Sequence, residues 1–354
     1  MVQKRFYIFI ILLAITASSF GQQDPQFSQY MYTILPFNPG YAGNSTICAS
    51  LHYRQQWAGF TDVVYPPDGT GEPSFHKTAP RDAMVSVHGY VKPLHGGLGL
   101  TIFQDAAGFQ SDIAVKFAYS FRLNLGGGSL GIGLSADMLS RQAHKDLYRP
   151  GISADPQFIA SMGESDMHID LSFGAYYQMQ NKWYAGISVT QLAEGIVGGD
   201  KDLQPGARHL YVLGGYTFDL PANPDWQLKP SALIKTDLSN FQAELSLIAD
   251  YKNLVWAGVS YRAVDAAVIL VGAKPFINFS NAIKGLEVVG SYDITTSKML
   301  QMGKVDKIND KGGFRRSYGG YEFCIKYCFS IVTKPPIYGY KGTRLLGNKP
   351  IEYR

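Results

Sequence analysis

The stretch SDIAVKFAYSFRL, residues 111–123, decides the fold because its side chains alternate strictly between two kinds. From Ile113 onward, every second residue is large and apolar, and the residues between them are small, polar or charged. Successive side chains of a β-strand point to opposite faces, so the stretch predicts a strand with one apolar and one polar face. This pattern is typical of membrane barrels, in which lipid lies outside and a polar lumen inside.

The same alternation recurs along most of the chain. It predicts fourteen strands, at 46–57, 81–92, 97–105, 111–123, 129–140, 167–179, 183–193, 208–220, 226–237, 241–251, 254–263, 265–273, 284–293 and 318–329. Strands of a soluble sandwich could alternate similarly, but these small or charged inner residues would leave its core hydrated. We therefore expect an all-β, antiparallel outer-membrane barrel over residues 46–329. Pro230 conflicts with its strand, because proline cannot donate to the ladder.

The connections between the expected strands separate into long and short ones. The longest, 58–80, 141–166 and 294–317, all fall on one side of the barrel. Bacterial outer-membrane barrels have long outer loops and short periplasmic turns, so we expect this side to be extracellular. An even strand count then returns the N- and C-termini to the periplasm.

The first 21 residues predict a secretory signal peptide. Lys4 and Arg5 precede an apolar run at 6–15, and small residues follow up to Gly21, after which we expect cleavage. The run is too short for a membrane-spanning helix, which needs about 20 residues. Removing the two cations leaves 30 basic and 28 acidic residues, a balance that does not indicate a nucleic-acid partner.

Two further segments flank the expected barrel. The lead-in, 22–45, is too apolar to stay in water and is a candidate plug of the lumen. The basic tail, 330–354, has two readings: a flexible terminus, or a periplasmic docking segment. The candidate docking residues are aromatic, leucine and cationic side chains: Tyr338, Tyr340, Lys341, Arg344, Leu345, Lys349, Tyr353 and Arg354.

Motifs of enzyme chemistry are missing from the sequence. It has no GxSxG, HExxH, GxxxxGK[ST] or CxxC pattern. His88 and His95 flank a turn and could approach a metal, but ordinary polar positions explain them better. His168 and Asp170 share an inner face without a placed serine nucleophile. We expect no enzyme, no catalytic residue, no metal and no cofactor.

The three cysteines would lie on inner faces of the first and last strands. Cys324 and Cys328 are four residues apart, about 13 Å along a strand, which is too far for a disulfide. Closure of a barrel sets the first strand against the last, and this makes Cys48 and Cys328 a candidate disulfide. The disulfide is a hypothesis, and three unpaired thiols remain the default expectation.

Three blocks near the N-terminus carry a family resemblance: DPQFSQYM at 24–31, NPGYAG at 38–43 and YRQQW at 53–57. They resemble the N-terminal signature of the PorP/SprF family. The resemblance implies an outer-membrane component of the type IX secretion system of Bacteroidota, serving export of surface proteins and often gliding motility. It also implies partners: secretion subunits, periplasmic ring or peptidoglycan-associated components, and a secreted adhesin or its C-terminal domain. It supplies no catalytic residues, and it leaves open whether the chain is a core component or the companion of one adhesin.

Two functions remain open at this stage. In the first, the three long loops capture a secreted protein or a neighbouring subunit, and the tail contacts the periplasmic machine. In the second, the barrel is a channel for small solutes or hydrophobic compounds, since a barrel of this size can enclose a pore.

Overall fold

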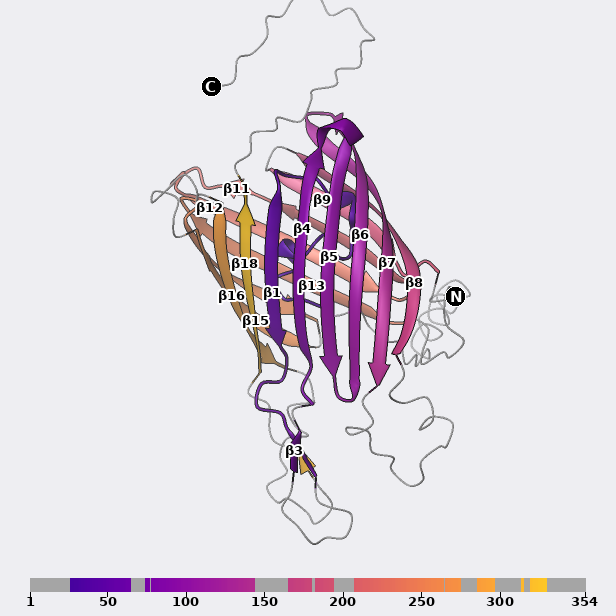
Figure 1. Ribbon diagram of the computed structural model, residues 1–354. Helices are drawn as coiled ribbons and strands as arrows, with labels where there is room; N and C mark the ends of the chain where they lie inside the picture. Colours follow the sequence, from indigo (N-terminus) through magenta and orange to yellow (C-terminus); the bar gives the residue numbers. More distant parts are fainter. Residues whose placement is uncertain are drawn as a thin grey trace, which may run out of the picture.

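The computed structural model describes residues 26–64, 74–76, 78–143, 165–179, 182–193, 207–263, 265–274, 285–296, 313–314 and 319–329. Within them, fourteen antiparallel strands form a closed barrel (Figure 1). The strands are β1 (Cys48–Gln55), β4 (Arg81–Val91), β5 (Gly96–Ala107), β6 (Gln110–Leu125), β7 (Gly128–Ala143), β8 (Ser165–Met179), β9 (Trp183–Thr190), β10 (His209–Tyr216), β12 (Trp226–Thr236), β13 (Phe241–Tyr251), β14 (Val255–Arg262), β15 (Ala266–Ala273), β16 (Leu286–Thr295) and β18 (Gly320–Cys328). Each overlaps one predicted strand, so the predicted fold is confirmed. In this part of the chain, no helix has the length and apolar character needed to cross a bilayer.

The barrel closes between its first and last strands. β1 pairs with β18 from Cys48 opposite Cys328 to Gln55 opposite Tyr321. On its other side β1 pairs with β4, so both edges of the first strand are occupied. Closure removes the free edges whose unpaired backbone groups could not be satisfied in lipid.

Pro230 lies inside β12, and the ladder is interrupted opposite it. β10 pairs with β12 up to Gly215 opposite Ser231, and the pairing resumes with β11 (Phe218–Asp219), where Phe218 lies opposite Leu228. The register is the same on both sides of the gap. β10 and β11 are thus one strand, broken where the partner has no N–H to donate.

The side chains divide as the alternation predicts. On β6, Phe117 is 55% exposed on the outer face, and Ser120 is fully buried on the inner face. Aromatic pairs lie where strands end, among them Tyr177 with Trp183 and Trp226 with Tyr251, each with ring centroids 4.9 Å apart. An apolar outer band flanked by aromatic rings is typical of barrels in a membrane.

The two rims of the barrel differ. The terminal rim is the one where β1 begins and β18 ends, and the turns 126–127 and 252–254 lie on it. The long-loop rim, at the lower end in Figure 1, carries a separate small sheet made of β2 (Asp62–Val64), β3 (Ser74–His76) and β17 (Gly313–Phe314). This sheet joins the connection after β1 to the one before β18.

A tight turn at 237–240 also lies on the long-loop rim. The Asp237 carboxylate accepts hydrogen bonds from the backbone N–H groups of Ser239 (2.9 Å) and Asn240 (2.5 Å). Burial acts to raise the pKa of Asp237, but these donations outweigh it and hold the pKa below its ordinary value. The turn is therefore well fixed at neutral pH.

Candidate functional site: the segment inside the barrel

Residues 26–44, here called the luminal segment, run through the lumen from one rim to the other. At one end, the Gln26 amide donates to Glu244 (2.9 Å), near the long-loop end of β13. At the other end, Asn44 accepts from Arg122 (2.6 Å), near the terminal-rim end of β6. The segment is the indigo trace inside the barrel in Figure 1. It includes two short 3₁₀ turns, η1 (Tyr30–Tyr32) and η2 (Pro39–Tyr41).

A buried polar network anchors the start of the segment. The Glu322 carboxylate accepts the backbone N–H groups of Ser28 (2.8 Å) and Gln29 (3.2 Å). The Ser28 hydroxyl donates to Asp293 (2.8 Å) and accepts from Arg262 (2.8 Å). Buried charges are tolerated only when they are paired and hydrogen-bonded. The segment is therefore part of what satisfies the charges of this wall.

The charges also pair with one another around the network. Arg262 lies 3.0 Å from Glu244 and 3.8 Å from Asp293, and Arg54 lies 3.3 Å from Asp293. Arg54 additionally donates to the Gln26 carbonyl oxygen. Five strands of the barrel, β1, β13, β14, β16 and β18, thus converge on the first residues of the luminal segment.

The middle of the segment packs against apolar side chains on three walls of the lumen. Tyr30 and Ile34 pack with Tyr211, Leu213 and Leu233 of β10 and β12. On another wall the Tyr32 ring stacks on Trp256, with centroids 5.8 Å apart, beside a cluster that includes Val268, Leu270 and Val289. On the third wall Leu35 contacts Ala118. These contacts hold the segment across the middle of the lumen, against three of its walls.

The last part of the segment lies in a trough of inner-wall glycines. A Cβ atom on Gly97 would overlap Ala42, and one on Gly133 would overlap the backbone of Pro39. Asn38 fixes the position of the segment in this trough. Its side chain donates to the Ala175 carbonyl oxygen (3.1 Å) and accepts from Gly40 N–H (3.0 Å). Backbone packs directly on backbone here, which only glycine permits.

Sequence reasoning missed the glycine trough and the apolar inner-wall residues. The glycines occur at inner positions of β5, β7 and β8, and the apolar residues at inner positions of β10 and β12 to β16. Apolar residues on the polar face of several strands were the available signal, because a water-filled lumen would not favour them.

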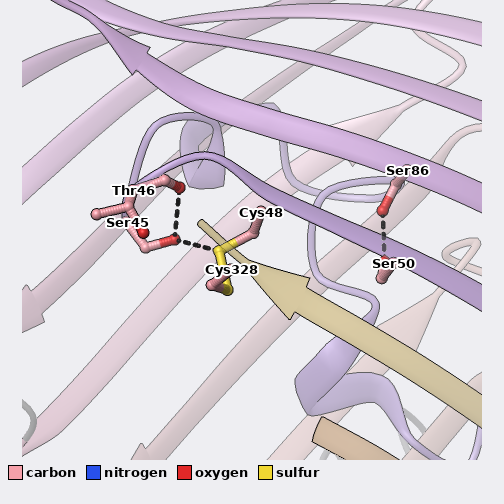
Figure 2. Close-up of a disulfide and its surroundings, with 6 residues drawn as sticks. All are labelled: Ser45, Thr46, Cys48, Ser50, Ser86 and Cys328. Atoms are coloured by element: carbon pink, nitrogen blue, oxygen red, sulfur yellow. Dashed lines mark hydrogen bonds between the residues drawn. A yellow bond between two sulfur atoms is a disulfide. The ribbon is translucent and has the colours of Figure 1, made fainter. Parts of the chain in front are cut away.

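The structure brings the candidate cysteines together. Cys48 and Cys328 form a disulfide, with an S–S distance of 2.07 Å and a Cα–Cα distance of 4.0 Å (Figure 2). They are the pair that closes the seam at the terminal rim, and the Ser45 hydroxyl lies 3.1 Å from the Cys48 sulfur. Cys324 is a buried free thiol, 3.4 Å from His52 Nε2.

The structure also places the histidines considered as ligands. His88 is buried in the inner wall, with its ring 5.0 Å from that of Tyr41, and His95 lies in a turn with φ 51°. Across the described ranges, no three His, Cys, Asp or Glu side chains gather as a metal site would require. His168 and Asp170 are both buried in β8, where Asp170 accepts the N–H of Ala193 (2.9 Å). The tail candidates at 338–354 lie outside the described residues, as do residues 1–21.

Among solved structures, the chain is similar to several barrels. A Pseudomonas aeruginosa FadL homologue is 14% identical, with 80% of this chain and 90% of that one covered at a TM-score of 0.39. The Acinetobacter baumannii outer-membrane protein Omp33 is 7% identical, with 79% and 97% covered and a TM-score of 0.40. The P. putida toluene transporter TodX is 10% identical, with 82% and 92% covered and a TM-score of 0.43.

No curated protein matches the sequence. One family model matches residues 19–306 of the chain. The family is described as type IX secretion system membrane protein PorP/SprF. The match includes the luminal segment and every strand of the barrel from β1 to β16. The chain therefore belongs to the PorP/SprF family of type IX secretion system membrane proteins.

Proposed function

We propose that this membrane component of type IX secretion acts in the outer membrane by binding protein partners, and not by conducting small solutes. The observation that carries the proposal is the luminal segment. Its buried contacts reach three walls of the lumen and five strands of the barrel. A solute channel needs a continuous passage, and these contacts place the segment across the lumen where such a passage would run.

The long-loop rim is the surface we assign to exported partners. Connections 58–80, 141–166 and 294–317, which together lie largely outside the described residues, start and end on strands whose ends are at this rim, and the small sheet of β2, β3 and β17 joins the first and the last of them. With this rim outside the cell, the loops hold a secreted adhesin, its C-terminal domain or a neighbouring outer-membrane subunit. A specific interface buries about 1,000 Å² or more, an area that loops of this length can supply.

The terminal rim then faces the periplasm. β18 ends at this rim, and the chain continues from Phe329 into the basic tail at 330–354. We assign the tail to periplasmic ring or peptidoglycan-associated components, with its cations and tyrosines as the contacts. Gliding motility is a further role that this placement would serve.

Affinity purification from the native outer membrane tests the proposal. Full-length protein is compared with a version ending after Thr333 and with a full-length version in which Lys341, Arg344, Lys349 and Arg354 are replaced by Gln. We expect secretion subunits or one large surface protein to co-purify with the full chain. Periplasmic partners should be lost from the truncated form and reduced in the Gln form. A barrel that purifies alone in all three forms would contradict the proposal.

A further inference from the structure

A polar cavity of about 510 Å³ lies in the mouth of the barrel at the long-loop rim. Its lining includes the amides of Gln26 and Gln242, the cations Arg54 and Arg262, and the carboxylates of Asp82, Asp105 and Asp265. Gln56, also in its lining, lies just past the end of β1, so the cavity reaches the rim itself. Gln26, the first described residue of the luminal segment, is thus in the cavity lining, and the cavity lies at the long-loop rim.

The direction in which the luminal segment runs determines which part of the chain lies next to the cavity. The segment starts at Gln26 in the cavity lining and proceeds toward the terminal rim, where β1 begins. The residues that precede Gln26 in the chain are covalently bound to this starting point. Chain running back toward the terminal rim would have to pass beside these buried contacts on three walls. The cavity offers a route that leaves the contacts untouched.

We propose that the cavity is the seat of residues 22–25, and that the mature N-terminus emerges at the long-loop mouth of the barrel. The segment Gln-Gln-Asp-Pro is as polar as the cavity lining. Four extended residues reach up to about 14 Å, which brings the chain from Gln26 to the rim. Among the described residues, the buried Arg54 Nε has no hydrogen-bond partner, and Asp24, two residues before Gln26, brings a carboxylate that can accept from it.

The inference rests on cleavage after Gly21 and, for the side of the membrane, on the orientation in the proposed function. It replaces the expectation of a periplasmic N-terminus. The chain would enter at the outer mouth, cross the lumen as the luminal segment and then begin the barrel at the periplasmic rim. Its N-terminus would therefore share the outer surface with the long loops and be available to the same partners.

Cysteine labelling in cells tests this topology. Gln23→Cys is compared with Ser239→Cys, in the long-loop turn 237–240, and with Ala222→Cys, in an exposed turn of the terminal rim. A membrane-impermeant polyethylene-glycol maleimide is applied to intact and to permeabilised cells, with the parent protein as the baseline. Mass analysis of each purified protein verifies that position 23 is retained after signal cleavage.

We expect position 23 to react on intact cells like position 239, and position 222 to react only after permeabilisation. If position 23 instead follows position 222, the inference is overturned and the orientation stands. If position 222 reacts on intact cells and position 239 does not, the orientation in the proposed function fails, and position 23 must still follow position 239. An epitope inserted between Gln22 and Gln23 gives the same answer by antibody binding if position 23 is shielded from the reagent.

Discussion

At the scale of single residues, the luminal segment approaches the barrel wall most closely at the inner-wall glycines. Gly133 is opposed by the backbone of Pro39, which cannot move aside as the end of a flexible side chain could. Close packing of this kind tolerates no added atoms without a shift of the backbone.

We predict that Gly133→Ala destabilises the protein by about 1–3 kcal/mol, the usual cost of overpacking, and loosens the luminal segment. Gly290→Ala is the matched control, since the nearest atom to its added Cβ is 3.8 Å away. Heat-dependent migration in SDS gels measures stability, and protease cleavage within 26–44 measures the loosening. Equal behaviour of the two variants would show that the segment does not lie against β7.

Loss of the Glu322 carboxylate should also weaken the anchoring of the luminal segment. Glu322→Ala leaves the buried N–H groups of Ser28 and Gln29 without acceptors, at a cost of about 1–3 kcal/mol for each unsatisfied group. The control is Asp225→Ala, which removes an exposed carboxylate 3.3 Å from Lys252 and should cost less than about 1 kcal/mol. The same melting and proteolysis assays apply. If the Glu322→Ala variant is as resistant to protease as the parent protein, the buried polar network around Glu322 has no structural role.

Not all of these residues could be predicted from the sequence. Barrel closure makes the pairing of Cys48 with Cys328 a candidate, because closure alone sets the first strand against the last, but the sequence does not decide it against three unpaired thiols. The role of Gly133 depends on a segment about a hundred residues earlier in the chain, and nothing local to β7 identifies Pro39 as its neighbour. Contacts between a strand and an irregular segment leave no period in the sequence.

At the scale of elements, the seam between β1 and β18 is held in two ways. Eight residue pairs form its ladder, and the disulfide adds a covalent link at the terminal rim. The ladder alone keeps the barrel closed, so the link should add stability without being required for folding.

We predict that replacing both Cys48 and Cys328 by Ser lowers stability by about 2–4 kcal/mol, the typical contribution of a disulfide, while the barrel still forms. Cys324→Ser, at the buried free thiol, is the control that should not remove the sensitivity to reductant. Heat-dependent migration with and without dithiothreitol is the measurement. Mass mapping that finds all three thiols free in the purified protein would refute the link.

The strands were predictable because the sequence of each one alternates between apolar and polar residues. A strand between lipid and lumen must alternate, whichever strands lie next to it, and even the strand at 266–273 could be marked. The path of the luminal segment could not be derived, because 3₁₀ turns and extended residues have no shared period. Its apolar composition indicated that it needed burial and made it a candidate plug of the lumen, but did not indicate which residues it contacts.

At the scale of the whole molecule, the barrel and its contents form one structure. The outer face is apolar, the inner wall is polar near the long-loop rim and apolar in the middle, and the luminal segment contacts both inner regions. Under the proposed function, partners bind at the two rims, and the luminal segment keeps the interior from conducting small solutes.

The most direct test of this claim is conductance in planar lipid bilayers, comparing the full-length protein with a version that lacks residues 26–44. We expect the full-length protein to show no ion conductance and the deletion to open a steady one, since the segment's contacts lie across the lumen. Steady conductance by the full-length protein, equal to that of the deletion, would show that the segment does not block the lumen and would favour a solute channel.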